Sequence, residues 1–357
     1  MNNDTFPWDH YSDQPHILKR SLKKELRKGH KLDYLKLIAT NLLYFPYLFL
    51  KFSGKHFKSE AFVPNKAKIK PNFYGLCVNL DKGEAQYNLV EELGVKSLQI
   101  RVFLNDIENI DAYVAFAKGF GDDKEILITI IQDREHIENH QLLAKDIRTI
   151  FKKFENITNE FMIGNAINRI KWAFVSMEEY LAFYEVVQKV RDEGFKNIKL
   201  IGSSIIDFEY HFTIRTLFNN YSVFYDKVAS LLYVDRRGSP YATQMGIFDF
   251  KNKIEFLDTI VKSSSKCDNG IYITEANWPL TGTAPYAPTS ELECVSEELY
   301  NNYMLEYFDI AQKSGKIEKV YWHQLIAPGY GLVDNRDGII RKTEAFYSFK
   351  KLTKGDS

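Results

Sequence analysis

The stretch from Glu125 to Gly164 reads EILITII QDREHIENH QLLAKDIRTIFKKF ENITN EFMIG. Its first and last blocks, Glu125–Ile131 and Glu160–Gly164, are short apolar runs of the kind that form buried strands. The block Gln141–Phe154 repeats apolar residues at helical spacing. A strand, a helix and a second strand in this order are typical of a βαβ unit in a parallel sheet.

The same alternation runs along the chain from Asn72 onward. The other predicted strands are Phe73–Val78, Ser97–Phe103, Ile198–Ser203, Ala229–Val234, Gly270–Thr274 and Val320–Gln324, and further helices are predicted at Met177–Asp192, Lys251–Ser264, Glu297–Lys313 and Thr343–Leu352. Eight strands with helices between them predict an α/β fold, a single (β/α)₈ TIM barrel. A doubly wound open sheet is the alternative, but Gly75 stands alone where its glycine-rich fingerprint would follow the first strand.

Composition narrows the class of function. Hydrophobic residues make up 45% of the 357 residues and charged residues 26%, which is the balance of a globular protein with a full core. A formal net charge of zero argues against a nucleic-acid partner. Cys77, Cys267 and Cys294 are odd in number and lack ligand spacing, so we expect no disulfide framework, no metal site and no cofactor, and a reducing compartment.

The region before the barrel has a different character. We expect a basic helical extension over residues 1–70 and the barrel domain over 71–357, because a Lys- and Pro-rich connector separates them. Residues 17–58 carry eleven Lys or Arg against two acids, and the apolar run Leu35–Phe52 is interrupted by polar residues and a proline. Two interpretations remain: peripheral contact with an anionic membrane through residues 17–58, or packing across the bottom of the barrel. No signal peptide is visible, so we expect a cytoplasmic location, peripheral at the inner face of the membrane in the first interpretation.

Polar side chains follow the ends of the predicted strands. They include Arg101, Gln132, Asp133, Asn165, Asn168, Arg169, Asp207, Glu209, Tyr233, Asp235, Arg236, Glu275, Trp278, Trp322 and Gln324. In a TIM barrel the carboxyl ends of all strands meet at one mouth, where the chemistry occurs. A gathering of carboxylates, guanidinium groups, amides and indoles there favours a polyol or another polar ligand.

Two of these strand ends carry a more specific pattern. Ile271-Tyr-Ile-Thr-Glu275-Ala-Asn-Trp278 and Val320-Tyr-Trp322-His-Gln324 resemble the seventh and eighth strands of the clan A retaining glycoside hydrolases, the cellulase-like and xylosidase/iduronidase-like families. The resemblance implies that Glu275 is the nucleophile and that Trp322 forms the floor of the sugar site. It also implies that Arg101 and Tyr233 orient the nucleophile. The alternative is a structural ion pair between Glu275 and Arg101.

The fourth strand departs from that pattern. The clan has Asn-Glu at this point, and here the residues are Asn165 and Ala166, so the resemblance implies that Asn165 binds the 2-hydroxyl while the acid/base carboxylate is missing. Three hypotheses follow. Another carboxylate transfers the proton, with Asp235, Glu209 or Asp133 as candidates; the leaving group needs no proton; or hydrolysis is lost and sugar binding is retained.

The remaining candidates would bind the substrate. They are Asn168, Arg169, Trp172, Arg236, Trp278 and Gln324. The sequence therefore predicts a glycosidase of the retaining type acting on a glycan or glycolipid of the cell envelope, with Glu275 as nucleophile and Asp235 as a second catalytic candidate. The alternative from a different class is an inactive sugar-binding pseudo-glycosidase that serves in glycan assembly.

Overall fold

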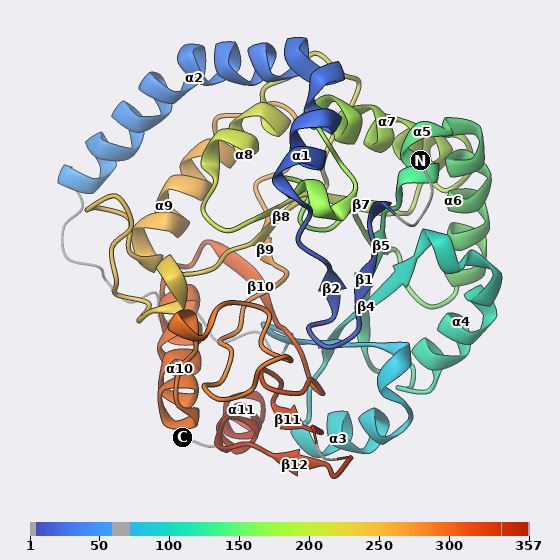
Figure 1. Cartoon of the computed structure of the whole chain (residues 1–357), viewed down its shortest axis with the longest axis vertical. Helices are drawn as coiled ribbons and strands as arrows, with labels where there is room; N and C mark the ends of the chain where they lie inside the picture. Colours follow the sequence, from blue (N-terminus) through green and yellow to red (C-terminus); the bar gives the residue numbers. More distant parts are fainter. Residues whose placement is uncertain (1–4, 59–71, 337, 356–357) are drawn as a thin grey trace.

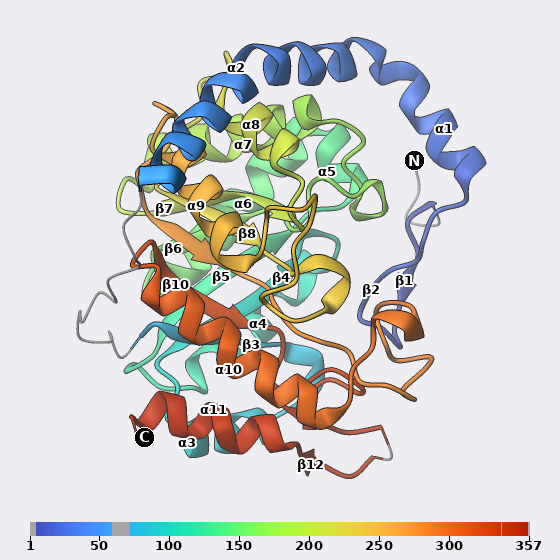
Figure 2. The same cartoon turned by 90° about the vertical axis from the view of Figure 1, so that its left-hand side faces the viewer.

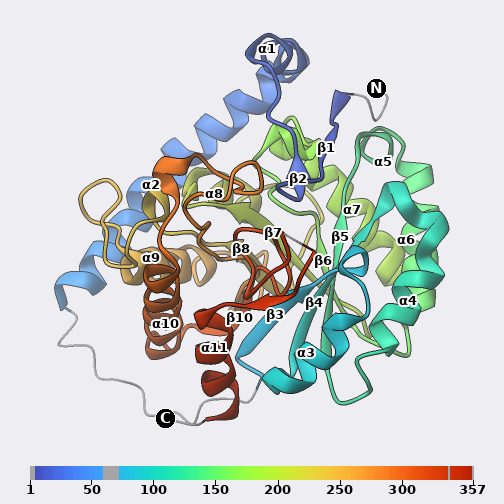
Figure 3. The same cartoon turned by 60° about the horizontal axis from the view of Figure 1, so that its bottom comes forward.

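A computed structural model describes residues 5–58, 72–336 and 338–355. Eight parallel strands close into a barrel in the order β10-β3-β4-β5-β6-β7-β8-β9 (Figure 3). The strands are β3 (Tyr74–Val78), β4 (Ser97–Phe103), β5 (Glu125–Ile131), β6 (Glu160–Ile163), β7 (Lys199–Ile206), β8 (Lys227–Leu231), β9 (Ile271–Ile273) and β10 (Ile317–Trp322). Each predicted strand overlaps one of these, so the predicted TIM barrel is confirmed.

Helices surround the strands as an outer layer (Figure 1). They are α3 (Ala85–Leu93), α4 (Ile110–Lys118), α5 (Arg134–Glu138), α6 (His140–Phe154), α7 (Met177–Gly194), α8 (Tyr210–Leu217), α9 (Phe250–Val261), α10 (Glu297–Lys313) and α11 (Glu344–Lys354). Side-chain caps begin several of them: Asn139 accepts from the Leu142 amide at 3.1 Å and Ser176 from the Glu179 amide at 3.3 Å.

The inside of the barrel is filled by side chains. Leu127, Met162, Ile201, Ala229, Tyr272 and Tyr321 form one buried apolar cluster, and each comes from a different strand. Gly75 is required by this packing, because a Cβ at that position would lie 2.5 Å from the Tyr321 ring. The barrel is therefore a packed core with its open end at the mouth.

The N-terminal extension folds onto this barrel. A short hairpin of β1 (Trp8–Asp9) and β2 (Gln14–Pro15) lies over the mouth and leads into α1 (Arg20–Arg27) and α2 (Lys31–Lys58). Figure 2 shows α2 bending along the outer side of the barrel, where it contacts α8 and α9, and Pro46 lies within it. The helical extension is thus confirmed. One of the two interpretations, packing across the bottom of the barrel, was wrong, because the inner face of α2 packs on the outer helices α8 and α9.

Several smaller features complete the fold. A two-stranded ribbon of β11 (Val333–Asp334) and β12 (Arg341–Lys342) follows β10. The predicted boundary between residues 70 and 71 lies outside the described residues. In the described part of the chain, no helix combines the length and apolar character needed to cross a bilayer. The three cysteines are free thiols.

The two faces of α2 provide a test of this packing. Leu48 is fully buried and Leu50 is 71% exposed. We expect Leu48→Ala to lower the free energy of unfolding by about 2–5 kcal/mol, because it leaves a cavity. The matched control Leu50→Ala should change it by less than about 0.5 kcal/mol. Urea unfolding measures both, and equal losses would contradict this docking of α2.

Candidate active site

A cavity of about 170 Å³, which we call the Glu275 cavity, lies at the barrel mouth. It is lined by Ser12, Asp13, Gln14, Arg101, Asn165, Ala166, Arg169, Lys171, Trp172, Ile206, Asp207, Tyr233, Arg237, Glu275, Asn277, Pro288, Thr289, His323 and Tyr330. These residues come from the ends of six barrel strands and from the hairpin. Barrel closure brings them together although they are far apart in the sequence.

Glu275 follows β9 and is held by a hydrogen bond from Tyr233, which follows β8. The Tyr233 hydroxyl donates to Oε1 of Glu275 at 2.7 Å. Burial raises the pKa of Tyr233 well above its ordinary value, and the neighbouring Glu275 carboxylate raises it further. The phenol therefore stays protonated and remains a donor to one oxygen of Glu275.

Tyr233 is itself fixed by two cations. The buried Lys253 donates from Nζ to the backbone oxygen of Tyr233 at 3.0 Å. The guanidinium carbon of Arg237 lies 3.1 Å from the centroid of the Tyr233 ring. These contacts hold the backbone and the ring of Tyr233, and its hydroxyl donates to Glu275.

The loop after β6, which is the fourth strand of the barrel, carries Asn165 and Ala166. The Gln132 side chain accepts from the backbone N–H of Asn165 and donates to its oxygen, both at 2.9 Å, and also donates to the oxygen of Trp172 at 2.6 Å. Ala166 is buried, lines the Glu275 cavity and has a positive φ of 45°. Position 166 therefore presents only a methyl group to the cavity.

Asp13, in the turn of the hairpin, reaches into the mouth. Its carboxylate forms an ion pair with Arg101 and accepts from Nε2 of Gln324 at 2.7 Å. Burial alone would raise the pKa of Asp13, but Arg101 acts together with Lys82, Gln324 and His323 to lower it. Burial would likewise lower the pKa of Arg101, and Asp13 is the main group that raises it. Both groups stay charged. The alternative prediction of an ion pair between Glu275 and Arg101 is therefore wrong, because the carboxylate that pairs with Arg101 belongs to Asp13.

Lys171 lines both the Glu275 cavity and a second, neighbouring chamber. Its Nζ donates to Oε1 of Gln14 at 2.5 Å. Burial lowers the pKa of Lys171 to about 8, although the Glu275 carboxylate acts in the opposite direction. Lys171 is therefore able to lose its proton at a pH only slightly above neutral.

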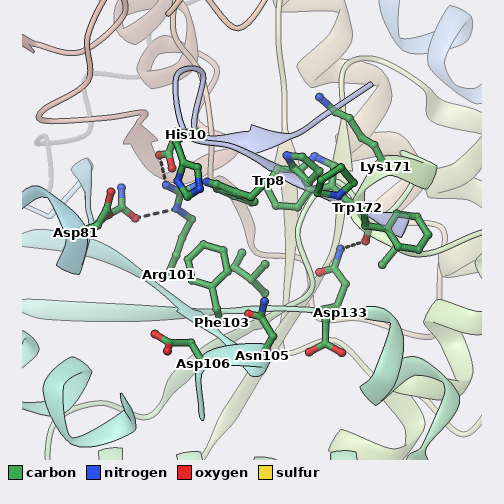
Figure 4. Close-up of a pocket in the computed structure, with 18 of the residues that line it drawn as sticks. Trp8, His10, Asp81, Arg101, Phe103, Asn105, Asp106, Asp133, Lys171 and Trp172 are labelled. Atoms are coloured by element: carbon green, nitrogen blue, oxygen red, sulfur yellow. Dashed lines mark hydrogen bonds and ion pairs between the residues drawn. The ribbon is translucent and has the colours of Figure 1, made fainter. Parts of the chain in front are cut away.

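The second chamber, which we call the Trp8 chamber, has a volume of about 590 Å³. Figure 4 shows Trp8 of the hairpin between Arg101 and Trp172. The rings of Trp8 and Trp172 meet edge to face, with centroids 5.7 Å apart. The carboxylates of Asp81, Asp106 and Asp133 also line this chamber. Within the described ranges, no group of three or more His, Cys, Asp or Glu could hold a metal ion.

The structure brings half of the predicted site residues into the Glu275 cavity. These are Arg101, Asn165, Arg169, Trp172, Tyr233 and Glu275. Arg169 is paired there, because it donates to Glu209 at 2.7 Å and to Asp207 at 2.5 Å.

Trp322 and Trp278 lie elsewhere. Both are buried with their rings stacked on each other at a centroid distance of 5.8 Å. Nε1 of Trp322 donates to the hydroxyl of Tyr300 on α10 at 2.8 Å, and Nε1 of Trp278 donates to the oxygen of Gly238 at 3.0 Å. Neither lines the cavity. This packing toward the helices corrects the predicted role of Trp322 as the floor of the sugar site and that of Trp278 in binding the substrate.

The polar candidates outside the cavity have structural contacts. Gln324 is buried beneath Asp13. Asn168 donates to Glu209 at 2.6 Å and to the Ile206 oxygen at 3.0 Å, which ties the β6 loop to β7. Arg236 is exposed in the turn after β8.

The three carboxylates proposed to transfer the proton are also outside the Glu275 cavity. Asp235 is half-buried in the turn after β8, Glu209 accepts from Arg169, and Asp133 caps α5 by accepting from the His136 amide at 3.0 Å. The geometry therefore corrects the predicted catalytic role of Asp235.

Four further residues of the cavity bear on its chemistry and are not among the predicted site residues: Asp13, Lys171, Arg237 and Asn277. Oδ1 of Asn277 and Nε of Arg237 are buried and have no hydrogen-bond partner among the residues described. Such atoms are available to a polar ligand. Lys171 follows the fourth strand closely enough to be found from sequence, whereas Asp13 lies in a segment that we expected to be helical.

Solved structures share this barrel. A family 1 β-glucosidase from Thermotoga maritima aligns with a TM-score of 0.58 at 14% identity over 82% of this chain and 100% of its own. The virulence factor SghA from Agrobacterium tumefaciens gives 0.60 at 10% identity over 81% and 98%. A monomeric β-xylosidase from Caulobacter crescentus gives 0.56 at 13% over 79% and 67%. The likeness establishes the fold.

No protein-family model and no curated protein matches the sequence. The structural neighbours are clan A glycoside hydrolases. At 10–14% identity, these three structures show a shared fold.

The Asp13–Arg101 pair predicts a pH-dependent contribution to stability. The folded-state pKa of Asp13 lies below its ordinary 3.8, so the pair stabilises above that value and its contribution is lost as pH falls through the folded pKa. At neutral pH we expect Asp13→Asn to cost about 3–5 kcal/mol, because Arg101 is left buried without a counter-charge. Urea unfolding measured from neutral to acidic pH should show this cost shrinking.

The exposed Asp122 provides the control. Asp122→Asn should change the stability little at any pH. A cost for Asp13→Asn that is independent of pH would contradict the ion pair.

Proposed function

We propose that this protein cleaves glycosidic bonds by a retaining mechanism in the Glu275 cavity, with Glu275 as nucleophile. The observation that carries the proposal is the hydrogen bond from Tyr233 to Glu275 in a cavity that also contains Asn165. The fold of the structural neighbours supports it as well. The substrate class that we propose is a glycan or glycolipid.

Glu275 would attack the anomeric carbon from Oε2, because Tyr233 holds Oε1. The hydrogen bond from Tyr233 fixes the carboxylate without protonating it. Asn165 would bind the hydroxyl next to the reacting carbon. The unpartnered oxygen of Asn277 could accept from another hydroxyl of the same sugar.

The proton for the leaving group needs a donor other than Ala166. The other carboxylates that line the cavity, Asp13 and Asp207, are each paired with an arginine. The pKa of Asp13 is lowered, so it carries no proton to give. Lys171, with a pKa of about 8, is protonated at neutral pH and lies between the cavity and the Trp8 chamber.

We therefore assign proton transfer to Lys171. As Glu275 bonds to the anomeric carbon, the bond to the leaving oxygen breaks and the Lys171 ammonium protonates that oxygen. In the second step the neutral amine takes a proton from water, the resulting hydroxide adds to the anomeric carbon, and the ester to Glu275 breaks. The Trp8 chamber would hold the leaving part of the glycan against Trp8 and Trp172.

Ala166 favours a second candidate, a sugar-binding protein that retains the cavity without cleavage. General acid catalysis contributes about 10²–10⁴-fold, so a barrel that lost its carboxylate acid can lose useful turnover and keep its ligand. The next experiment separates the two candidates.

Activated aryl glycosides test the nucleophile, because their leaving groups need little protonation. We expect a burst of aryl alcohol and a glycosyl ester on Glu275 that mass spectrometry detects after rapid quenching. Glu275→Gln should lower cleavage by several orders of magnitude and remove the ester. If a sugar binds both forms equally and neither cleaves any aryl glycoside across a broad panel, the binding candidate is correct.

The pH dependence tests Lys171. For alkyl glycosides, kcat/KM should fall as pH rises through about 8, because the ammonium that donates the proton is lost. Lys171→Met should lower kcat/KM on these substrates by about 10²–10⁴-fold and remove this pH limb, while cleavage of aryl glycosides changes much less.

The matched rescue experiment adds Ala166→Glu to the Lys171→Met variant. Residue 166 already carries a Cβ in its positive-φ conformation, so the backbone need not change. Recovery of alkyl glycoside cleavage with an acidic pH optimum would support a missing proton donor. An unchanged pH profile in Lys171→Met would refute the role of Lys171.

A further inference from the structure

The helix α2 has two apolar faces, and the barrel covers one of them. On the inner face Tyr44 stacks on Phe218 with centroids 4.3 Å apart, and Phe45 stacks on Tyr210 at 5.2 Å. Leu48 is fully buried, and Tyr44 and Phe45 pack against the apolar cluster to which it belongs. This face accounts for the attachment of α2 to the barrel.

The opposite face is apolar and open to solvent. Its residues, which we call the outer stripe, are Leu32, Leu35, Ile38, Leu42, Leu43 and Leu50, with exposed fractions between 55% and 74%. Their spacing of mostly three or four residues places them along one side of the helix. Scattered exposed leucines are normal in a globular protein, whereas a continuous stripe along one helix marks an interaction surface.

Positive charge accompanies the outer stripe. Five exposed basic residues lie on α1, in the short turn between the two helices and on the first turns of α2: Lys24, Arg27, Lys28, Lys31 and Lys36. One of the two acids in this segment, Asp33, is turned inward, where its carboxylate accepts from Ser176 Oγ at 2.8 Å. Glu25 is then the exposed acid of the segment, so the surface is strongly basic.

The shape of the segment suits a flat partner. α2 contains 28 residues, which corresponds to about 42 Å at ~1.5 Å per residue. Figures 1 and 2 both show it at the periphery of the molecule with its outer side uncovered. A helix of this kind lies in the plane of a bilayer interface, with leucines among the acyl chains and lysines among the headgroups.

We propose that the outer stripe docks onto the surface of a membrane that contains anionic lipids, with α2 lying in the plane of the leaflet. A second copy of the chain fits less well, because a symmetric contact would bring two basic segments together. Anionic headgroups instead complement the lysines and arginines.

Docking through α2 would place the membrane beside the barrel mouth. Leu18 and Leu26, at the start and end of the α1 region, pack against Ile170 and Val175 of the β6 loop. That loop carries Lys171 of the Glu275 cavity. A membrane-bound helix would therefore hold the mouth close to ligands at the lipid surface, a consequence that does not depend on whether Glu275 is a nucleophile.

Vesicle flotation with the full chain tests the proposal. We expect binding to vesicles of equal parts phosphatidylcholine and phosphatidylglycerol, weaker binding in high salt, and little binding to phosphatidylcholine alone. The double variant Leu42→Gln/Leu43→Gln should weaken binding by about tenfold or more, because two apolar side chains no longer enter the interface. The triple variant Lys28→Gln/Lys31→Gln/Lys36→Gln should weaken binding to the anionic vesicles specifically.

The control is Leu292→Gln/Ile339→Gln, which changes two apolar residues with exposed fractions of 96% and 73% outside α2. It should bind vesicles like the wild type, and circular dichroism should show that all variants remain folded. The proposal is overturned if the wild type binds neither kind of vesicle, or if the control loses as much binding as the stripe variant. It is also overturned if the wild type binds no vesicles and instead forms a dimer that Leu42→Gln/Leu43→Gln abolishes.

Discussion

Closure of the barrel is the constraint on which the rest of the molecule depends. Eight strands paired in a ring leave no free sheet edge, and because all of them are parallel their carboxyl ends lie at the same mouth. Residues as distant in sequence as Arg101 and Glu275 share one cavity for this reason. The buried cluster that includes Tyr272 and Tyr321 fills the inside of the barrel. The space for a ligand is therefore at the mouth, beyond this cluster. The hairpin then lies over that opening and narrows it.

The amino-acid sequence contains enough to predict this frame and part of the site. Apolar runs such as Glu125–Ile131 are long and well separated, so their number and order predict the barrel. Glu275 and Tyr233 follow strand ends directly, and barrel geometry alone places them at the mouth. Trp322 shows the limit of this reasoning. A strand buried on both faces is apolar on both, so its pattern does not tell which side chains face the mouth and which face the helices. Trp322 faces α10.

Asp13 and Lys171 show a second limit. The partner of Asp13 is Arg101, and no local pattern predicts a contact across 88 positions of sequence. Residues 1–70 were predicted to form a helical extension, so the short hairpin of β1 and β2 within it was missed. Lys171 was visible as a residue, but its chemistry depends on burial. An exposed lysine is a poor proton donor near neutral pH, and enclosure beside Gln14 and Trp172 lowers its pKa into a useful range.

The N-terminal extension is a structural part of the barrel mouth. Asp13 neutralises Arg101, Gln14 contacts Lys171, and Trp8 walls the neighbouring chamber, so three residues of the hairpin complete the mouth. The same segment continues into α1 and α2, whose inner face is fixed to the barrel by Leu48 and its aromatic neighbours. Removing the extension would therefore open the mouth and leave Arg101 buried without its carboxylate. For that reason, substitutions confined to the outer stripe can separate surface docking from the cavity, and truncation cannot.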